Sequence, residues 1–161
     1  MRAALLVALV LAGCDRPVPT DTPDTAGARL EAAATNAGLV PDANASAEGS
    51  WGRDTDRMCV IAGRDGLRAG ALVDYGEGQS CSASGTAERS ADGLTLRFGD
   101  CRIDARYDGD RITLPAEVPQ TCESLCTGRA TLAAMTVDRL SQSRSEAATL
   151  RSTDGRLLCG D

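Results

Sequence analysis

Four Asp-Gly pairs constrain the fold of this chain more than any other feature. They lie at residues 65–66, 92–93, 108–109 and 154–155. Asp-Gly supplies the positive φ angles of a type I′ turn, so each pair is a candidate hairpin turn. Apolar and polar residues alternate around most of these pairs, as in strands with one buried face. The sequence therefore predicts antiparallel hairpins.

About six short strands are predicted between residues 58 and 116, with a further turn at residues 76–78. After the turn at residues 92–93, apolar residues lie at even positions 94, 96 and 98, and then at odd positions 103, 105 and 107. This change of parity places a β-bulge or a tight turn at Gly99-Asp100. The regular spacing predicts a mainly β domain, a small antiparallel meander that forms a barrel or a sandwich.

Helical segments are predicted near the C-terminus. Residues 121–126 are typical of a helical turn, and residues 143–151 favour a helix. Residues 129–140 fit either a strand or a helix. The last Asp-Gly pair turns the chain toward Leu157, Leu158 and Cys159.

The N-terminus carries a targeting segment. Arg2 precedes ten apolar residues, 3–12, about half the ~20 that a membrane-spanning helix needs and typical of a signal peptide. The run ends in Leu11-Ala12-Gly13-Cys14, which resembles the lipobox of bacterial lipoproteins. The resemblance implies cleavage before Cys14 and acylation of that residue, with palmitate among the chains; a signal peptide with a chance cysteine is the alternative. Several acyl chains hold a protein on a membrane far better than one.

We expect three regions: a signal peptide at 1–13, a lipidated cysteine with a flexible tether and a short helix at 14–49, and a β-rich periplasmic domain at 50–161. Residues 15–28 are rich in Asp, Thr and Pro and are predicted to be extended. A helix is predicted for residues 29–39, where Gly38 can end it. Asp15 resembles the inner-membrane retention signal of enteric lipoproteins, which favours that membrane. The chain as a whole resembles small cysteine-containing envelope lipoproteins of unassigned function, which implies a location and no activity.

Seven cysteines are an odd number, and assigning Cys14 to lipid leaves six. The six are Cys59, Cys81, Cys101, Cys122, Cys126 and Cys159. The periplasm is oxidising, so three disulfides are expected to supplement the core.

The predicted topology gives hints about the pairing of these cysteines. The 92–93 hairpin suggests Cys81 with Cys101, and a clasp across the sheet suggests Cys59 with Cys159. Cys122 and Cys126 lie one helical turn apart, within reach of each other, although residues so spaced more often bond different partners. Half of a zinc site at these two cysteines and thiol catalysis are the alternatives.

Composition excludes several classes of function. The chain has no histidine, and all 17 basic residues are arginine. This excludes Ser-His-Asp and Cys-His nucleophiles, imidazole metal ligands, Schiff bases and phosphate-loop lysines. A net charge of −6 and four aromatic residues also argue against nucleic-acid binding. We therefore expect no enzyme, no cofactor and no metal.

Carboxylates form two clusters, which are read as solvated charged strand faces and turns. The members are Asp54, Asp56, Asp100, Asp104, Asp108 and Asp110. A glycoside-hydrolase pair of carboxylates stays open by residue type. A sugar cleft usually has aromatic walls, however, and Trp51 is expected in the core.

One segment resembles a family. Cys81-Ser82-Ala83-Ser84-Gly85-Thr86 is similar to the Ser-Ala-Ser-Gly loop of periplasmic C-type lysozyme inhibitors, which implies a lipid-anchored small β-barrel with disulfides. There a serine of the loop enters the lysozyme cleft, so Ser82 or Ser84 is the matching position. The family's basic and aromatic continuation is absent, and its partner lysine has no counterpart; a plain Ser-rich strand is the alternative. An acidic inhibitor would still be steered toward a cationic lysozyme.

The predicted function is therefore a membrane-anchored periplasmic domain, non-enzymatic, that binds a partner, such as a periplasmic protein, or supports the envelope. A lysozyme-type inhibitor is the alternative, and a carboxylate-dependent hydrolase is the second alternative.

Overall fold

A computed structural model describes residues 25–37, 39–91 and 93–160. The chain divides into two units, residues 1–39 and residues 40–161. The predicted signal peptide, Cys14 and Asp15 lie outside the described residues. Within the described part, no helix is both long enough and apolar enough to cross a membrane.

The first unit contains helix α1, Ala26–Asn36. The Thr25 side chain caps it by accepting a hydrogen bond from the Ala28 backbone N–H at 3.2 Å. The helix predicted for residues 29–39 is thus confirmed, with an earlier start. None of its residues is buried, and the predicted terminator Gly38 is outside the described residues.

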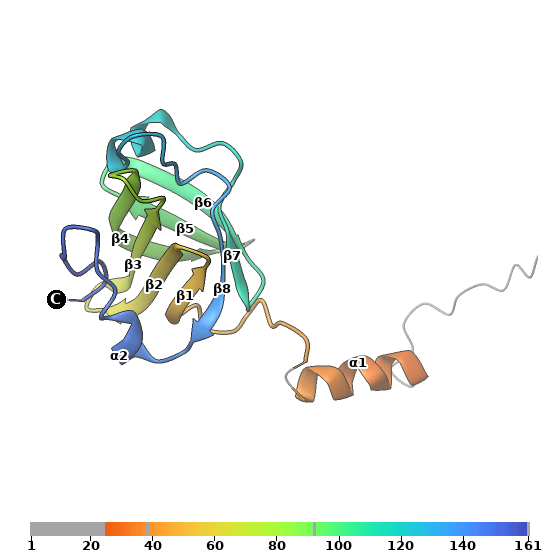
Figure 1. The fold of residues 1–161 in the computed structure, drawn as a ribbon. Helices are drawn as coiled ribbons and strands as arrows, with labels where there is room; N and C mark the ends of the chain where they lie inside the picture. Colours follow the sequence, from red (N-terminus) through yellow and green to blue (C-terminus); the bar gives the residue numbers. More distant parts are fainter. Residues whose placement is uncertain (1–24, 38, 92, 161) are drawn as a thin grey trace, which may run out of the picture. The chain divides into compact units, whose positions relative to one another are not determined.

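The second unit is a closed, eight-stranded antiparallel barrel in which each strand pairs with the next and β8 pairs with β1 (Figure 1). The strands are β1 Gly49–Arg53, β2 Asp56–Gly63, β3 Gly66–Asp74, β4 Ser80–Ser90, β5 Gly93–Phe98, β6 Cys101–Tyr107, β7 Arg111–Thr113 and β8 Thr136–Ser141. This architecture confirms the mainly β prediction and decides for a barrel over a sandwich.

The hairpins follow the predicted turns. Gly63 pairs with Gly66 across the β2–β3 turn. Phe98 pairs with Cys101, so the change of parity is a tight turn at Gly99-Asp100. These turns fix the register of the strands between them.

Two strands were not among the predicted six, and they are the pair that closes the barrel. Strand β1 follows the stretch read as a tether, and β8 lies mostly in the segment left open between strand and helix. The backbones approach closely where they meet, because a Cβ at Gly49 would collide with the Ser141 carbonyl oxygen. Gly49 also has φ +138°, which favours glycine.

The barrel interior is filled with side chains. The largest fully buried ones are Trp51, Phe98, Met58, Leu94, Leu96, Ile103, Ile112, Leu114 and Leu132. Strand β6 shows the expected alternation, with every second residue buried. Trp51 is fully buried, which confirms its predicted place in the core.

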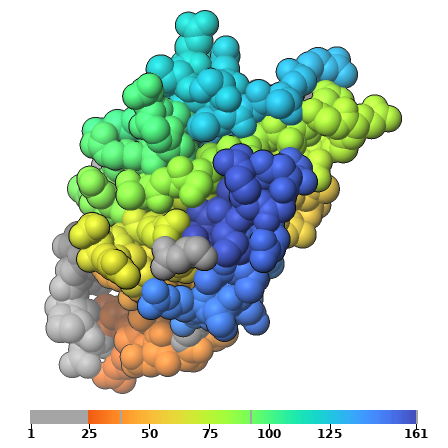
Figure 2. Space-filling view, turned by 90° about the vertical axis from the view of Figure 1, so that its left-hand side faces the viewer, coloured from red at the N-terminus to blue at the C-terminus, as the bar shows by residue number. Residues whose placement is uncertain are grey.

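The C-terminal segment packs on the outer face of the barrel and forms a second apolar cluster with β2 and the short helix α2, Arg144–Ala147. Figure 2 shows this dark-blue segment over the yellow and lime strands. Leu158 lies against Gly70, where a Cβ would have no room.

The helix predicted for residues 143–151 is a single turn, α2, which is capped by the Ser143 side chain. The helical turn predicted for 121–126 is the 3₁₀ helix Gln120–Leu125.

All six predicted disulfide cysteines are paired. The bonds are Cys59–Cys159, Cys81–Cys126 and Cys101–Cys122. The predicted clasp between Cys59 and Cys159 is confirmed. The suggested Cys81–Cys101 pair is wrong, because β5 lies between β4 and β6 and separates these two cysteines.

Candidate functional site

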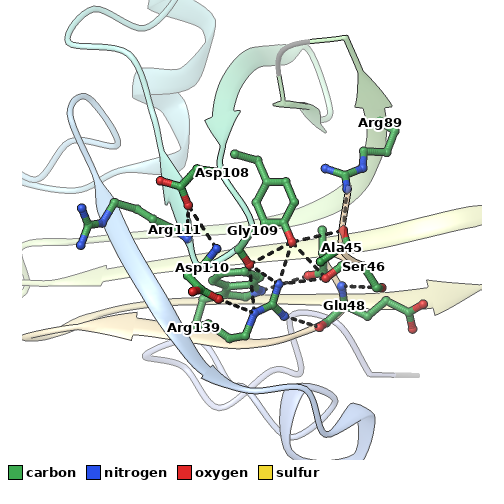
Figure 3. Close-up of polar contacts among 12 residues, drawn as sticks. Ala45, Ser46, Glu48, Arg89, Asp108, Gly109, Asp110, Arg111 and Arg139 are labelled. Atoms are coloured by element: carbon green, nitrogen blue, oxygen red, sulfur yellow. Dashed lines mark hydrogen bonds and ion pairs between the residues drawn. The ribbon is translucent and has the colours of Figure 1, made fainter. Parts of the chain in front are cut away.

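One end of the barrel is sealed by the chain's own residues, centred on Arg139 of β8 (Figure 3). Its guanidinium donates hydrogen bonds to the carbonyl oxygens of Gly109, Glu48 and Ser46, at 2.6, 3.0 and 2.9 Å, and to the Tyr107 hydroxyl at 2.7 Å. The Arg139 side chain is only 11% exposed. A guanidinium with this many protein acceptors is structural rather than a free binding group.

Aromatic residues complete this seal. The Arg139 guanidinium carbon lies 4.1 Å from the centre of the Trp51 ring. The Arg89 guanidinium carbon lies 4.5 Å from the centre of the Tyr107 ring. The two rings meet edge to face at 5.8 Å. Burial raises the pKa of Tyr107, and the positive charges of Arg139 and Arg89 oppose that shift.

A groove on the outer face has an excess of basic side chains. It has a volume of about 810 Å³ and is lined by the β2–β3 hairpin, by β4 and by the first residue of α2. Its basic side chains are Arg64 in the hairpin turn, Arg68 on β3 and Arg144 on α2; Asp65 is its one acidic residue. We call this surface the arginine groove.

The arginines of the groove differ in what they contact. Arg68 donates a hydrogen bond to the Gly160 carbonyl oxygen at 3.2 Å. The side chains of Arg64 and Arg144 are exposed, and neither forms an ion pair or hydrogen bond with any residue in the described part of the chain. These two guanidinium groups therefore have donors to offer a ligand.

The two serines of the lysozyme-inhibitor resemblance lie in strand β4 rather than in a loop. The Ser84 hydroxyl donates to the Leu158 carbonyl oxygen at 2.6 Å, and the Ser84 residue lines the arginine groove. The Ser82 hydroxyl is buried and has no hydrogen-bond partner among the described residues. The glycine of the motif has a structural role, because a Cβ at Gly85 would collide with the Arg97 carbonyl oxygen.

Two carboxylates of the acidic clusters, Asp104 and Asp108, accept hydrogen bonds from neighbouring residues. Asp104 and Asp108 line a second groove, of about 890 Å³. Asp104 accepts from the Thr95 hydroxyl at 2.6 Å, and this bond, with the nearby Arg102, lowers the pKa of Asp104. Asp108 accepts from two backbone N–H groups of its own turn. The general acid of a glycosidase needs a raised pKa, whereas the pKa of Asp104 is lowered.

Asp56 belongs to the other acidic cluster. Burial and the negative charge of Asp54 raise the pKa of its carboxyl group. Asp56 lies at the start of β2, next to the β1–β2 turn. Within the described residues, no cluster of three or more Cys, Asp and Glu side chains is arranged to hold a metal ion.

The sequence did not single out Arg64, Arg144 or Arg139. Arg64 precedes an Asp-Gly pair, and this position alone indicates only an exposed turn. Arg144 lies at the groove because α2 packs on β1 and β2. No local sequence pattern predicts this long-range contact. Comparison with known protein families, with curated proteins and with solved structures finds no match for this chain.

Proposed function

We propose that the protein is a membrane-tethered, non-enzymatic binding domain of the bacterial envelope, and that its ligand binds at the arginine groove. The single observation that carries this proposal is that the guanidinium groups of Arg64 and Arg144 lie in one groove and have no partner among the described residues. An eight-stranded barrel can hold a small ligand inside, but this interior is filled by side chains such as Trp51 and Phe98. Binding is therefore assigned to the outer surface.

The membrane tether is supported by the lipobox-like residues 11–14 and the polar stretch after them. Replacing Cys14 with Ser should move the protein from the membrane fraction to the soluble fraction of the cell. Intact mass before and after reduction should show the acyl chains together with three disulfides. Retention of the Cys14→Ser variant on membranes contradicts the tether.

The binding role is tested by photo-crosslinking in cells. A photoreactive phenylalanine derivative placed at position 65, which lines the groove and is exposed, keeps Arg64 and Arg144 and should give one discrete adduct. The same derivative at exposed position 129 should give none. The adduct should disappear when Cys14 is replaced with Ser, because release from the membrane dilutes the domain away from its ligand. Equal adducts at positions 65 and 129, or none at either, contradict the groove as the binding surface.

Lysozyme inhibition is the second candidate function. The observation in its favour is that Ser84 and Gly85 line the same groove as Arg64 and Arg144. Arginine can supply the positive charge that the family's lysine provides. The Ser84 hydroxyl already donates to Leu158, so the arginines would contribute most to this activity.

A turbidity assay with a cationic C-type lysozyme separates the two candidates. Inhibition by the wild-type protein that is lost in Arg64→Gln/Arg144→Gln and kept in Ser84→Ala supports inhibition through the groove. No inhibition at micromolar concentration removes this candidate and leaves the first one standing.

A further inference from the structure

We propose that the arginine groove recognises an acidic peptide segment bound in an extended conformation, a proposal that rests on the groove being the binding surface. The ligand would supply two carboxylates, one for Arg64 and one for Arg144. Its main-chain carbonyl groups would accept from other donors of the groove.

Charge is the first argument. The chain has a net charge of −6, whereas the groove brings three arginines together with one aspartate. A guanidinium can donate two parallel hydrogen bonds to one carboxylate, so a carboxylate is a well-matched ligand for each arginine. Arg64 and Arg144 lie on separate elements, a hairpin turn and a helix, so a ligand that satisfies both must carry acceptors at two places.

Shape is the second argument. Gly66 lines the groove at the β2–β3 turn, and nothing lies within 4 Å of the place where its Cβ would stand. A ligand main chain can therefore approach the backbone closely at this turn. The volume of about 810 Å³ lies in the range of ligand-binding clefts.

The third argument is that this face already holds a main-chain segment, the chain's own C-terminal residues. The Ser84 hydroxyl donates to the Leu158 carbonyl oxygen at 2.6 Å, and Arg68 donates to the Gly160 carbonyl oxygen at 3.2 Å. Figure 2 shows the C-terminal segment on the same face as the yellow β2–β3 hairpin. Side chains on β3 and β4 thus donate hydrogen bonds to a peptide backbone that lies over these strands. Arg64 and Arg144 add further donors to the same surface.

Titration by ¹⁵N–¹H NMR tests this inference, with the mature Cys14→Ser chain and a blocked six-residue peptide that carries two glutamates. At low salt, shifts are expected at the amides of residues 63–68, 84–86 and 144. The same peptide with two glutamines is the probe for charge. Arg64→Gln/Arg144→Gln should weaken binding of the glutamate peptide by about tenfold or more, since two charge-assisted contacts are lost.

Arg106→Gln/Arg129→Gln is the matched control, because it removes the same charge from two exposed arginines that do not line the groove. It should weaken binding by less than about twofold, through the long-range field alone. An equal loss in both double variants overturns the inference. Groove shifts of the same affinity with the glutamine peptide also overturn it, while the groove stays the binding surface. Shifts confined to other faces overturn this inference and the proposed binding surface together.

Discussion

Arg139 and Trp51 are register partners across the β1–β8 pair, and the guanidinium carbon of one lies 4.1 Å from the ring centre of the other. Strands β1 and β8 close the barrel with only three paired positions, whereas β2 and β3 have seven. A short seam leaves few backbone hydrogen bonds to hold it. The side chain of Arg139 adds bonds from β8 to the segment before β1 and to the β6–β7 turn, so it ties together the parts that the short strands hold least.

Replacing Arg139 with Ala should lower the free energy of unfolding by about 3 kcal/mol, because it removes several charge-assisted hydrogen bonds and the contact of the guanidinium with the Trp51 ring. Urea unfolding followed by Trp51 fluorescence measures the change. Arg111→Ala is the control, since that guanidinium is 49% exposed and paired with the exposed Asp138, and it should cost less than about 1 kcal/mol. Equal costs for the two variants would show that the seal around Arg139 contributes nothing special to the seam.

Gly49→Ala should destabilise the barrel by about 2 kcal/mol or more, because the new methyl group meets the Ser141 carbonyl oxygen at a residue with positive φ. Gly52→Ala on the same strand is the comparison. There a Cβ meets Arg57 Cδ and Leu140 Cδ1, both at 2.9 Å, and these are side-chain atoms rather than backbone. Leu140 is exposed and can move, whereas the Arg57 guanidinium donates to the Asp54 and Asp56 carbonyl oxygens. We expect a loss of about 1 kcal/mol or less for Gly52→Ala. Thermal melts of the two variants check the difference, and similar melting temperatures would contradict a close approach at Gly49.

The sequence was informative where turn residues and alternation agree, which covers β2 to β6. It left most of β8 open between a strand and a helix, and it did not predict β1. The missing signal for β1 has a physical reason. Strand β1, Gly-Ser-Trp-Gly-Arg, is short and has two glycines, so it shows no alternation, and its glycines reflect close contact with β8 rather than a turn. Without this pair the remaining strands fit a barrel or a sandwich equally well.

The candidate site was less predictable than the fold. Ser82 and Ser84 were identified by a local resemblance, yet Gly85 and Ser84 have structural roles in the barrel and in holding the C-terminal segment. The groove depends on Arg64 and Arg144, which are far apart in the chain. Their proximity follows from the packing of α2 on the barrel, which no short-range pattern encodes.

The Cys59–Cys159 disulfide should contribute more to stability than Cys101–Cys122. Their sequence separations are 100 and 21 residues, and the longer loop loses more entropy in the unfolded chain when it is closed. The chain-entropy relation gives a difference of about 1.4 kcal/mol. Urea unfolding of the double alanine variants measures it, and Cys59→Ala/Cys159→Ala should also speed amide exchange at Leu158. A smaller loss for the 59–159 variant would mean that the C-terminal segment separates from the barrel before global unfolding.

Asp138 should make the stability of the barrel depend on pH in the acid range. Hydrogen bonds from Arg53 and Arg111, with their positive charges, hold the pKa of Asp138 below its ordinary value of 3.8. A carboxyl whose pKa is lower in the folded state stabilises that state above the unfolded pKa, and this contribution is lost as the pH falls through the folded pKa. Asp138→Asn should therefore cost up to about 1 kcal/mol at pH 7, and its stability should converge with the wild type as the pH falls through the lowered pKa of Asp138.

The opposite sign is expected for Asp56→Asn, because burial and Asp54 raise the pKa of Asp56 in the folded state. This variant should be more stable than the wild type at pH 7, and the gain should shrink as the pH falls through the raised pKa and the wild-type carboxyl takes up its proton. Urea unfolding of the three proteins between pH 2 and 7 measures both trends. A cost of Asp138→Asn that stays constant over the whole range would mean that the Arg53–Asp138–Arg111 contacts act through shape and not through charge.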